Sequence, residues 1–201
     1  MTRPAEHVAA VVLAAGASTR MGSPKPLVRL GDGRTFLEAL ASSLRDGGVR
    51  GRIFVVTGSQ RAVVAAEAKR LGLTSVHNAR FARGQLSSAL VGLRAALRAG
   101  ALPLLLLPCD MPHLRSATVA KLLATEPPAH PVRAGSPGHP IYLDRPTAIA
   151  LLARGKAASL RAALRSAGVR ARRVPVNDRA IHENINTPAQ LQRWENRRAP
   201  L

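Results

Sequence analysis

The feature that most constrains the fold of this chain is a regular alternation of short strand-like runs with segments of helical character. The runs lie at residues 8–14, 53–57, 75–78 and 102–107. The first and the last of them are apolar throughout, which is typical of parallel strands that are buried on both faces. Because a helical segment follows each run, the sequence predicts a doubly wound, mostly parallel α/β sandwich of three layers.

The segments between the runs carry helix signals. Thr35 and Glu38 have the spacing of a capping box, which predicts a helix from about residue 36 to Gly47. Further helices are predicted at 61–71, 84–98, 116–124, 147–152, 159–167 and 188–196. The stretch 125–138 is rich in Pro, Gly and small residues and predicts a long loop or short edge strands, and 141–143 and 174–176 are predicted as late strands. A length of 201 residues predicts one domain over 1–201, with a basic tail from about residue 197.

The composition of the chain limits the classes of partner that can be expected. The chain has 30 Lys and Arg against 11 Asp and Glu, a net charge of +19, which attracts polyanions such as nucleic acid or a polyphosphate substrate. Aromatic residues make up only 2%, so platforms for base stacking are scarce and a nucleic-acid partner is not expected. One cysteine, Cys109, excludes an intramolecular disulfide. Without a signal-like or membrane-spanning apolar run, we expect a cytoplasmic protein with no membrane partner.

The stretch Val11–Leu27 has the character of a phosphate-binding loop. The first apolar run ends at Gly16, and a loop of small residues carries two cations, Arg20 and Lys25. Free backbone N–H groups in such a turn can bind an anion, and the two cations add charge at its phosphates. The spacing matches neither the Rossmann fingerprint nor the Walker loop. The alternative is an ordinary strand-to-helix turn with two solvated cations.

Asp110 is the most informative acid. It directly follows the leucine run and stands between Pro108 and Pro112, which restrict the local backbone. A carboxylate held in this way suits a hard cation such as magnesium, although turn aspartates are common. Gly16 and Asp110 both follow predicted strands, and the carboxyl ends of strands are where open α/β sheets bind ligands. We therefore expect both residues to face one cleft.

Five segments of the chain carry motifs that occur in one order. The segment Leu13-Ala-Ala-Gly-Ala-Ser-Thr-Arg-Met-Gly-Ser-Pro-Lys25 resembles the signature loop of a known family, the MobA-like nucleotidyltransferases, and Pro108-Cys-Asp-Met-Pro112 resembles the metal-binding segment of that family. The other three, in family order, are Gly84-Gln-Leu-Ser-Ser88, Gly138-His-Pro140 and Asn184-Ile-Asn-Thr-Pro188. The resemblance covers nearly the whole chain and implies a Rossmann-like fold of the nucleotide-diphospho-sugar transferase type.

The resemblance implies a role for each matching residue. Leu13, Ala14, Ala15 and Gly16 would hold the base and ribose side of a nucleotide, with Ser87 or Ser88 close to them. Arg20 and Lys25 would bind the phosphates, and with Asp110 they would form the catalytic set. Asp110 and Asn186 would bind Mg²⁺, and His139, Asn184 and Asn186 would lie on the acceptor side. The alternatives are structural roles: His139 would be an ordinary histidine of a surface loop, and Ser87 and Ser88 would cap their helix.

The implied reaction moves a nucleoside monophosphate from a nucleoside triphosphate to a phosphorylated acceptor and releases pyrophosphate. The acceptor implied first is the molybdopterin cofactor with CTP, and a molybdoenzyme or its chaperone is an expected partner. GTP is the alternative nucleotide, because Pro108–Pro112 and the asparagines of the last motif resemble the guanylyltransferase branch. A sugar-1-phosphate acceptor and a non-catalytic nucleotide- or nucleic-acid-binding module remain the other hypotheses.

Overall fold

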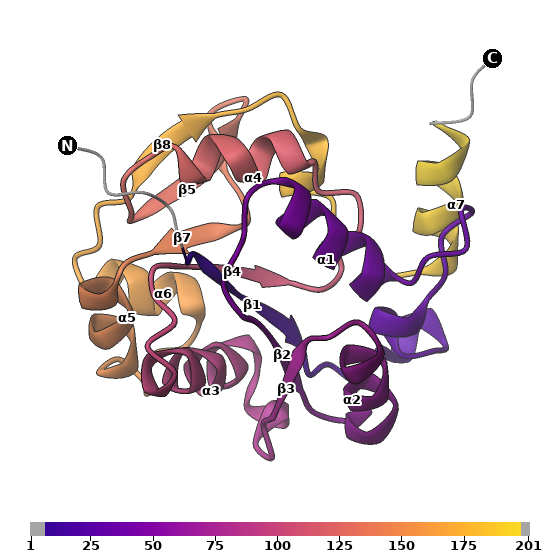
Figure 1. Cartoon of the computed structure of the whole chain (residues 1–201), viewed down its shortest axis with the longest axis horizontal. Coiled ribbons are helices and arrows are strands. Elements are labelled where there is room, and N and C mark those ends of the chain that lie inside the picture. Colours follow the sequence, from indigo (N-terminus) through magenta and orange to yellow (C-terminus); the bar gives the residue numbers. More distant parts are fainter. Residues whose placement is uncertain (1–6, 198–201) are drawn as a thin grey trace.

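The computed structural model describes residues 7–197, and within them eight strands form one mixed sheet covered by helices on both faces (Figure 1). The strand order is β3-β2-β1-β4-β7-β5-β6, and β8 pairs with β5. The strands are β1 Ala9–Ala14, β2 Ile53–Thr57, β3 Thr74–His77, β4 Leu104–Pro108, β5 Ala129–Arg133, β6 Ser136–Pro137, β7 Ile141–Leu143 and β8 Arg172–Pro175. The predicted fold class is confirmed.

Strand β1 lies at the point where the chain changes its direction of travel across the sheet. It pairs in parallel with β2 on one side, Ala10 opposite Ile53, and with β4 on the other, Ala9 opposite Leu104. The chain runs outward from β1 to β2 and β3, and then crosses back to place β4 on the free edge of β1. Open α/β sheets bind ligands at such a reversal, beyond the carboxyl ends of the strands, which here are those of β1 and β4.

The late part of the chain extends the sheet with an antiparallel section. Strand β7 runs antiparallel to β4, with Leu104 opposite Leu143, and β5 pairs with β7 in the same sense. Strand β8 then runs parallel to β5. The proline-rich stretch 125–138 therefore forms strands β5 and β6 rather than a long loop, and the predicted pairing of 141–143 with the sheet is confirmed.

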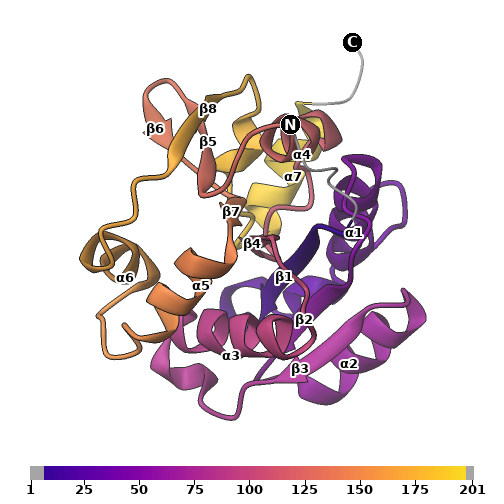
Figure 2. The same ribbon diagram turned by 60° about the vertical axis from the view of Figure 1, so that its left-hand side comes forward.

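The helices divide between the two faces of the sheet. Helices α1, α2 and α4 contribute to the core on one face, and α3, α5 and α6 to the core on the other (Figures 1 and 2). Their bounds are α1 Phe36–Asp46, α2 Arg61–Arg70, α3 Gln85–Arg98, α4 Ser116–Leu123, α5 Arg145–Leu152, α6 Leu160–Ser166 and α7 Pro188–Asn196. None of the helices described is long and apolar enough to cross a bilayer.

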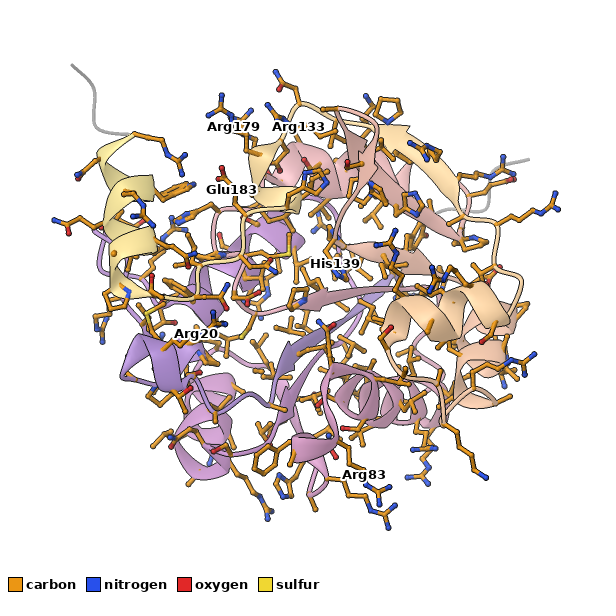
Figure 3. All side chains as sticks on the ribbon, turned by 180° about the vertical axis from the view of Figure 1, so that it is seen from behind. Arg20, Arg83, Arg133, His139, Arg179 and Glu183 are labelled. Atoms are coloured by element: carbon orange, nitrogen blue, oxygen red, sulfur yellow. The ribbon has the colours of Figure 1, made fainter. Side chains whose placement is uncertain are left out.

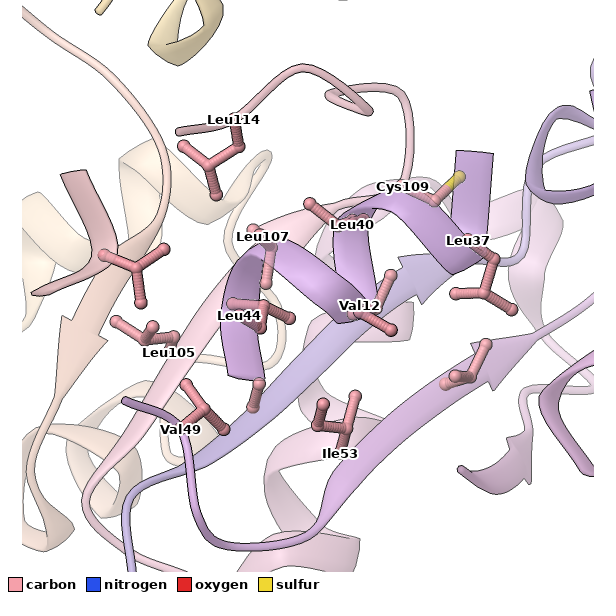
Figure 4. Packing of buried hydrophobic residues seen from close by; sticks show 14 of the residues in the cluster. Val12, Leu37, Leu40, Leu44, Val49, Ile53, Leu105, Leu107, Cys109 and Leu114 are labelled. Carbon is pink, nitrogen blue, oxygen red and sulfur yellow. The ribbon is translucent and has the colours of Figure 1, made fainter. Parts of the chain in front are cut away.

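The core on the first face is built from aliphatic side chains of alternate strand residues. Val12 and Leu107 point from the sheet toward Leu40 and Leu44 of α1, and all four are fully buried (Figure 4). The predicted capping box fixes the start of this helix: the Thr35 side chain accepts a hydrogen bond from the Glu38 backbone N–H at 3.1 Å. Burial of each such leucine contributes roughly 1.5–3 kcal/mol of transfer free energy.

Helix α7 packs away from the sheet, over the loop that follows β1. Leu191 and Trp194 contact a small apolar cluster of Met21, Phe36 and Ile185, and the Trp194 ring stacks on His113. The C-terminal end of the described chain therefore closes over the signature loop (Figure 1). The predicted basic tail lies, apart from Arg197, outside the described residues.

Helix α3 approaches the opposite face of the sheet closely at a glycine. A Cβ at Gly92 would overlap Val11 Cγ1 and would lie 3.0 Å from Val56 Cγ2, so the helix backbone rests directly on β1 and β2. Any side chain at this position must push the helix off the sheet, which would displace the first turn of α3 as well.

We expect Gly92→Ala to lower the free energy of unfolding by about 1–3 kcal/mol, because overpacking outweighs the better helix propensity of alanine. Chemical denaturation measures this. Gly155→Ala is the matched control: its Cβ would meet no atom closer than 3.5 Å, so its stability should change by less than about 0.5 kcal/mol. Equal stability of Gly92→Ala and the wild type would contradict the close contact.

Candidate functional site

A cleft of about 260 Å³ opens where β1 and β4 end. The predicted nucleotide residues Leu13, Ala14, Ala15 and Gly16 line one wall, and Asp110 lines another. They meet because Cys109 N–H donates to the Leu13 carbonyl at 3.1 Å, which continues the pairing of β1 with β4 up to the cleft. The expectation that Gly16 and Asp110 face one cleft is therefore met by the geometry.

The loop after β1 folds back on itself, and it contains one residue, Ser18, with a strained backbone conformation. Ser18 has φ 55° and ψ 27°, a left-handed conformation that is uncommon for a residue with a Cβ. Its hydroxyl oxygen accepts a hydrogen bond from the Lys25 backbone N–H at 3.0 Å, which draws Lys25 toward the cleft. At Gly16 a Cβ would meet no protein atom within 4 Å, so neither packing nor backbone conformation demands a glycine there. That glycine keeps the cleft wall open.

Four polar side chains from separate parts of the chain meet at the mouth of the cleft. Lys25 Nζ donates to Asp110 Oδ2 at 3.0 Å and to Asn186 Oδ1 at 2.7 Å. Arg20 Nη2 donates to the same Asn186 oxygen at 3.2 Å. Lys25 and Asp110 are each 15% exposed, so this ion pair is largely screened from solvent. The predicted catalytic residues Arg20, Lys25 and Asp110 therefore lie in one cluster.

The backbone on both sides of Asp110 holds its carboxylate in place. Its own carbonyl accepts a hydrogen bond from the Ile185 N–H at 2.9 Å, which fastens the segment before α7 to the end of β4. One carboxylate oxygen binds Lys25, whereas the other, Oδ1, is buried and has no hydrogen-bond partner in the described part of the chain. An unpaired buried carboxylate oxygen is costly, and a ligand that approaches it would remove that cost.

Asn186 is fixed by the start of α7. Its backbone N–H donates to Gln190 Oε1 at 2.6 Å, and its side-chain amide donates to the Asn184 carbonyl at 3.0 Å. Gln190 also forms the capping box with Thr187. The Asn184 side chain is exposed and lines a separate hollow beside Arg193. The structure thus brings Asn186, but not the side chain of Asn184, to Lys25 and Asp110.

The serine pair at the start of α3 is organised by Asn78. The buried Asn78 amide donates to Ser87 Oγ at 2.9 Å and to Ser88 Oγ at 3.0 Å. Ser88 lines the cleft, whereas Ser87 lies outside its wall and donates to backbone carbonyls of Arg80 and Gly84. Sequence reasoning missed Asn78, although a polar residue directly after β3 is the same signal that drew attention to Asp110.

His139 lies behind the cleft rather than at its mouth. It lines a second cavity, and burial lowers its pKa, while the Asp110 carboxylate acts in the opposite direction. Figure 3 shows His139 near the middle of the molecule and Arg20 on the side of α7. Arg83, at the other end of the same view, is remote from both.

Cys109 is not equipped to act as a nucleophile. Burial, together with the neighbouring Asp110 carboxylate, raises the pKa of its thiol to about 12, so the thiolate is scarce at neutral pH. Within residues 7–197, no three His, Cys, Asp or Glu side chains gather closely enough to hold a metal ion. A cation at Asp110 would need other oxygen ligands.

Comparison with curated proteins finds a relative for part of the chain. A bifunctional IPC transferase and DIPP synthase of Rubrobacter xylanophilus is 43% identical over 94 residues, which cover 44% of this chain and 21% of that protein. The match therefore spans about a fifth of the length of that relative.

Solved structures resemble the whole described fold. A nucleotidyl transferase from Methanothermobacter thermautotrophicus matches with a TM-score of 0.78 and 24% identity, over 95% of this chain and 97% of that one. The manganese complex of Rv0371c from Mycobacterium tuberculosis gives 0.70 and 23%, over 94% and 98%. The molybdopterin-guanine dinucleotide biosynthesis protein A of Archaeoglobus fulgidus gives 0.67 and 20%, over 94% and 97%. At such identities the likeness shows the fold alone.

The family follows from a model match that spans the cleft and both strand ends. The model of the MobA-like NTP transferase domain matches residues 10–174, which include the signature loop, Asp110 and His139. The resemblance to this family is thereby confirmed, and the segment Asn184–Pro188 lies outside the matched residues. This chain belongs to the family of the MobA-like NTP transferase domain.

Proposed function

We propose that this chain is a nucleotidyltransferase that moves a nucleoside monophosphate from a nucleoside triphosphate to a phosphorylated acceptor and releases pyrophosphate. The observation that carries the proposal is the convergence of Arg20, Lys25, Asp110 and Asn186 at the mouth of the cleft between β1 and β4. Two cations and a carboxylate at a strand-order reversal suit a polyphosphate and its counter-ion.

The lining of the cleft supports one orientation of the bound nucleotide. The base and ribose lie toward Leu13–Gly16 and Ser88, where backbone groups and a fixed hydroxyl line the wall. The triphosphate lies toward Lys25 and Arg20 at the mouth, because these side chains supply the positive charge there. Asn78 acts as a positioning residue, since it holds the Ser88 hydroxyl from behind.

Asp110 and Asn186 fit a divalent cation such as magnesium. Asp110 Oδ1 is a buried oxygen without a partner in the described chain, and Asn186 Oδ1 is a second oxygen close to the same Lys25 ammonium. Hard cations take carboxylate and carbonyl oxygens and commonly share substrate phosphates, so two protein ligands suffice. A bound cation there would neutralise phosphate charge and orient the α-phosphoryl group.

The transfer step needs alignment more than acid–base chemistry. An oxygen of the acceptor phosphate attacks the α-phosphorus, the bond from that phosphorus to the bridging oxygen breaks, and pyrophosphate leaves with the electron pair. The attacking phosphate is already anionic, so no strong general base is required. Lys25 and Arg20 stabilise the negative charge that grows on the leaving pyrophosphate. We assign His139 to the acceptor side, because it lines the second cavity and its imidazole is within reach of the Asp110 charge.

Among acceptors we favour the molybdopterin cofactor with CTP, and a molybdoenzyme or its chaperone as the recipient of the product. The MobA-like family match supports this choice. GTP is the alternative nucleotide, and a sugar-1-phosphate is the alternative acceptor. A second function, nucleotide binding without catalysis, is favoured by one observation: the last motif offers the carboxamide of Asn186 where a carboxylate would add charge.

We expect Lys25→Ala and Asp110→Ala each to lower turnover by about 10²–10³-fold, because each removes charge stabilisation that acts in the transition state. Pyrophosphate release with the acceptor and CTP or GTP measures this. The matched controls are Lys156→Ala and Asp46→Ala, which remove the same charges from exposed positions on the surface. Turnover within threefold of wild type in either site variant, with the protein folded, would count against the assigned roles.

A thermal-shift panel of CTP, GTP, ATP and UTP with magnesium tests nucleotide binding directly. A nucleotide that binds the native state stabilises it by RT ln(1 + [L]/Kd), or about 2.7 kcal/mol at a hundredfold excess over Kd. We expect the largest shift with CTP, and the shift should be lost in Lys25→Ala. If none of the four nucleotides raises the midpoint, the proposed function is wrong.

Lys25 Nζ lies between the two groups assigned to the cation, since it contacts the Asp110 carboxylate through Oδ2 and the Asn186 side chain through Oδ1. We therefore expect Lys25→Met to bind Mn²⁺ about tenfold more tightly than wild type in the absence of nucleotide, because a competing ammonium is gone. Calorimetric titration with Mn²⁺ alone measures the change, and Lys156→Met is the control. Unchanged or weaker binding by Lys25→Met would place the cation elsewhere.

A further inference from the structure

Within residues 7–197, α7 is the only α-helix that has no buried residue. It nevertheless begins just after Asn186, whose side chain accepts hydrogen bonds from both cations at the mouth of the cleft. An element with few buried contacts is opened more easily than the core of a protein. The few contacts that hold α7 in place therefore bear on the geometry of the nucleotide site.

The first of these contacts is made by an aromatic ring near the end of α7. The Trp194 ring stacks on the His113 imidazole, with an angle of 5° between the two planes. His113 follows Asp110 in the segment after β4. Trp194 and Leu191 also pack against the apolar cluster that contains Met21 of the signature loop. This end of α7 thus contacts both segments that supply charged groups to the site.

The second contact is a hydrogen bond to the chain that follows the signature loop. Glu195 Oε1 accepts it from the Gly31 backbone N–H at 2.7 Å. Gly31 lies in the turn that leads from the signature loop to α1, and Figure 1 shows this turn beside α7. A carboxylate acceptor makes such a bond stronger than one between neutral groups. Glu195 therefore fastens α7 to the loop that carries Lys25.

A short series of contacts carries the position of α7 to the two cations. Gln190, in the first turn, accepts the Asn186 backbone N–H through Oε1 at 2.6 Å, so Asn186 moves with the helix. The Asn186 side chain in turn binds Lys25 and Arg20. Both cations have long side chains, and holding them before a ligand arrives reduces the entropy that is lost on binding. The docking of α7 therefore decides how well the cations are prepared for a triphosphate.

We propose that Trp194 and Glu195 are positioning residues of the nucleotide site. They act through α7: the two side chains fix the far end of the helix on the segments around the site, and the near end then holds Asn186 against the two cations. Because coupling is reciprocal, a triphosphate that draws the cations away from Asn186 also changes the docking of α7. This inference rests on the proposed function, since it assumes that a triphosphate binds to these cations.

Calorimetric titration with magnesium and the α,β-methylene analogue of CTP or GTP tests the proposal. We expect Trp194→Ala and Glu195→Ala each to weaken binding of the analogue by about tenfold, which is within the usual range for coupling between two sites. Trp194→Phe and Glu195→Gln should bind within about threefold of wild type, because the Phe ring can still stack and the Gln amide oxygen can still accept the hydrogen bond.

The charge of Glu195 separates a positioning role from a simple electrostatic one. Loss of a carboxylate near the site would by itself strengthen the binding of an anion, so weaker binding by Glu195→Ala has to come from the lost contact. Gln192→Ala is the matched control, because it alters an exposed side chain of the same helix and should bind the analogue as wild type does. Equal binding by Trp194→Ala and wild type, or an equal loss in Gln192→Ala, refutes the positioning role.

The fluorescence of Trp194 provides an independent test in the unaltered protein. Trp194 is the only tryptophan of the chain, so the tryptophan emission reports on the docking of α7. We expect the analogue with magnesium to change this emission along a saturable curve, with the dissociation constant that calorimetry gives. At saturating analogue, the change should be lost in Asn186→Ala, because the link between the cations and the helix is removed.

Constant Trp194 emission while calorimetry shows binding overturns the coupling, because a helix that serves only as structure would give this result. The two levels of the argument fail separately. Absence of calorimetric binding in the wild type overturns the proposed function and this inference together. Binding that is insensitive to Trp194→Ala and Glu195→Ala overturns this inference alone.

Discussion

The parallel pairing of β1 with β4 is the constraint on which the rest of the structure depends. It joins Leu13 to Pro108 and continues one residue further, where Cys109 N–H reaches the Leu13 carbonyl. Everything that follows these two strands is therefore held at one edge of the sheet. Without this pairing, the signature loop and Asp110 would have no fixed relation, because 85 residues separate Lys25 from Asp110 in the chain.

Charge balance at that edge is maintained by the protein itself. Lys25 bridges Asp110 and Asn186, so the free site keeps two cations, one carboxylate and one carboxamide in mutual contact. The arrangement leaves a single oxygen of Asp110 buried without a partner in the described residues. A site of this kind is prepared for an anionic ligand with a counter-ion, because both the excess of positive charge and the unpaired oxygen are then compensated.

The distant segment before α7 completes the cluster, and it could not be placed from spacing alone. Ile185 N–H binds the Asp110 carbonyl, and Gln190 holds the Asn186 backbone. Pattern analysis could locate the start of α7, because Thr187, Pro188 and Gln190 form a local capping signal. The resemblance assigned Asn186 to the cation and both asparagines to the acceptor side. In the tertiary fold one side chain turns toward Lys25 and the other toward the hollow beside Arg193.

The sequence by itself determined the fold class, the order of most elements and the residues of the signature loop. These depend on local signals: apolar runs, capping boxes and a motif of near neighbours. Only the tertiary structure decided the strand roles of 129–133 and 136–137, the support of Ser88 by Asn78, and the junction of two cavities at Gln85. Each of these depends on contacts between segments far apart in the chain, and such contacts produce no local or periodic pattern in the sequence.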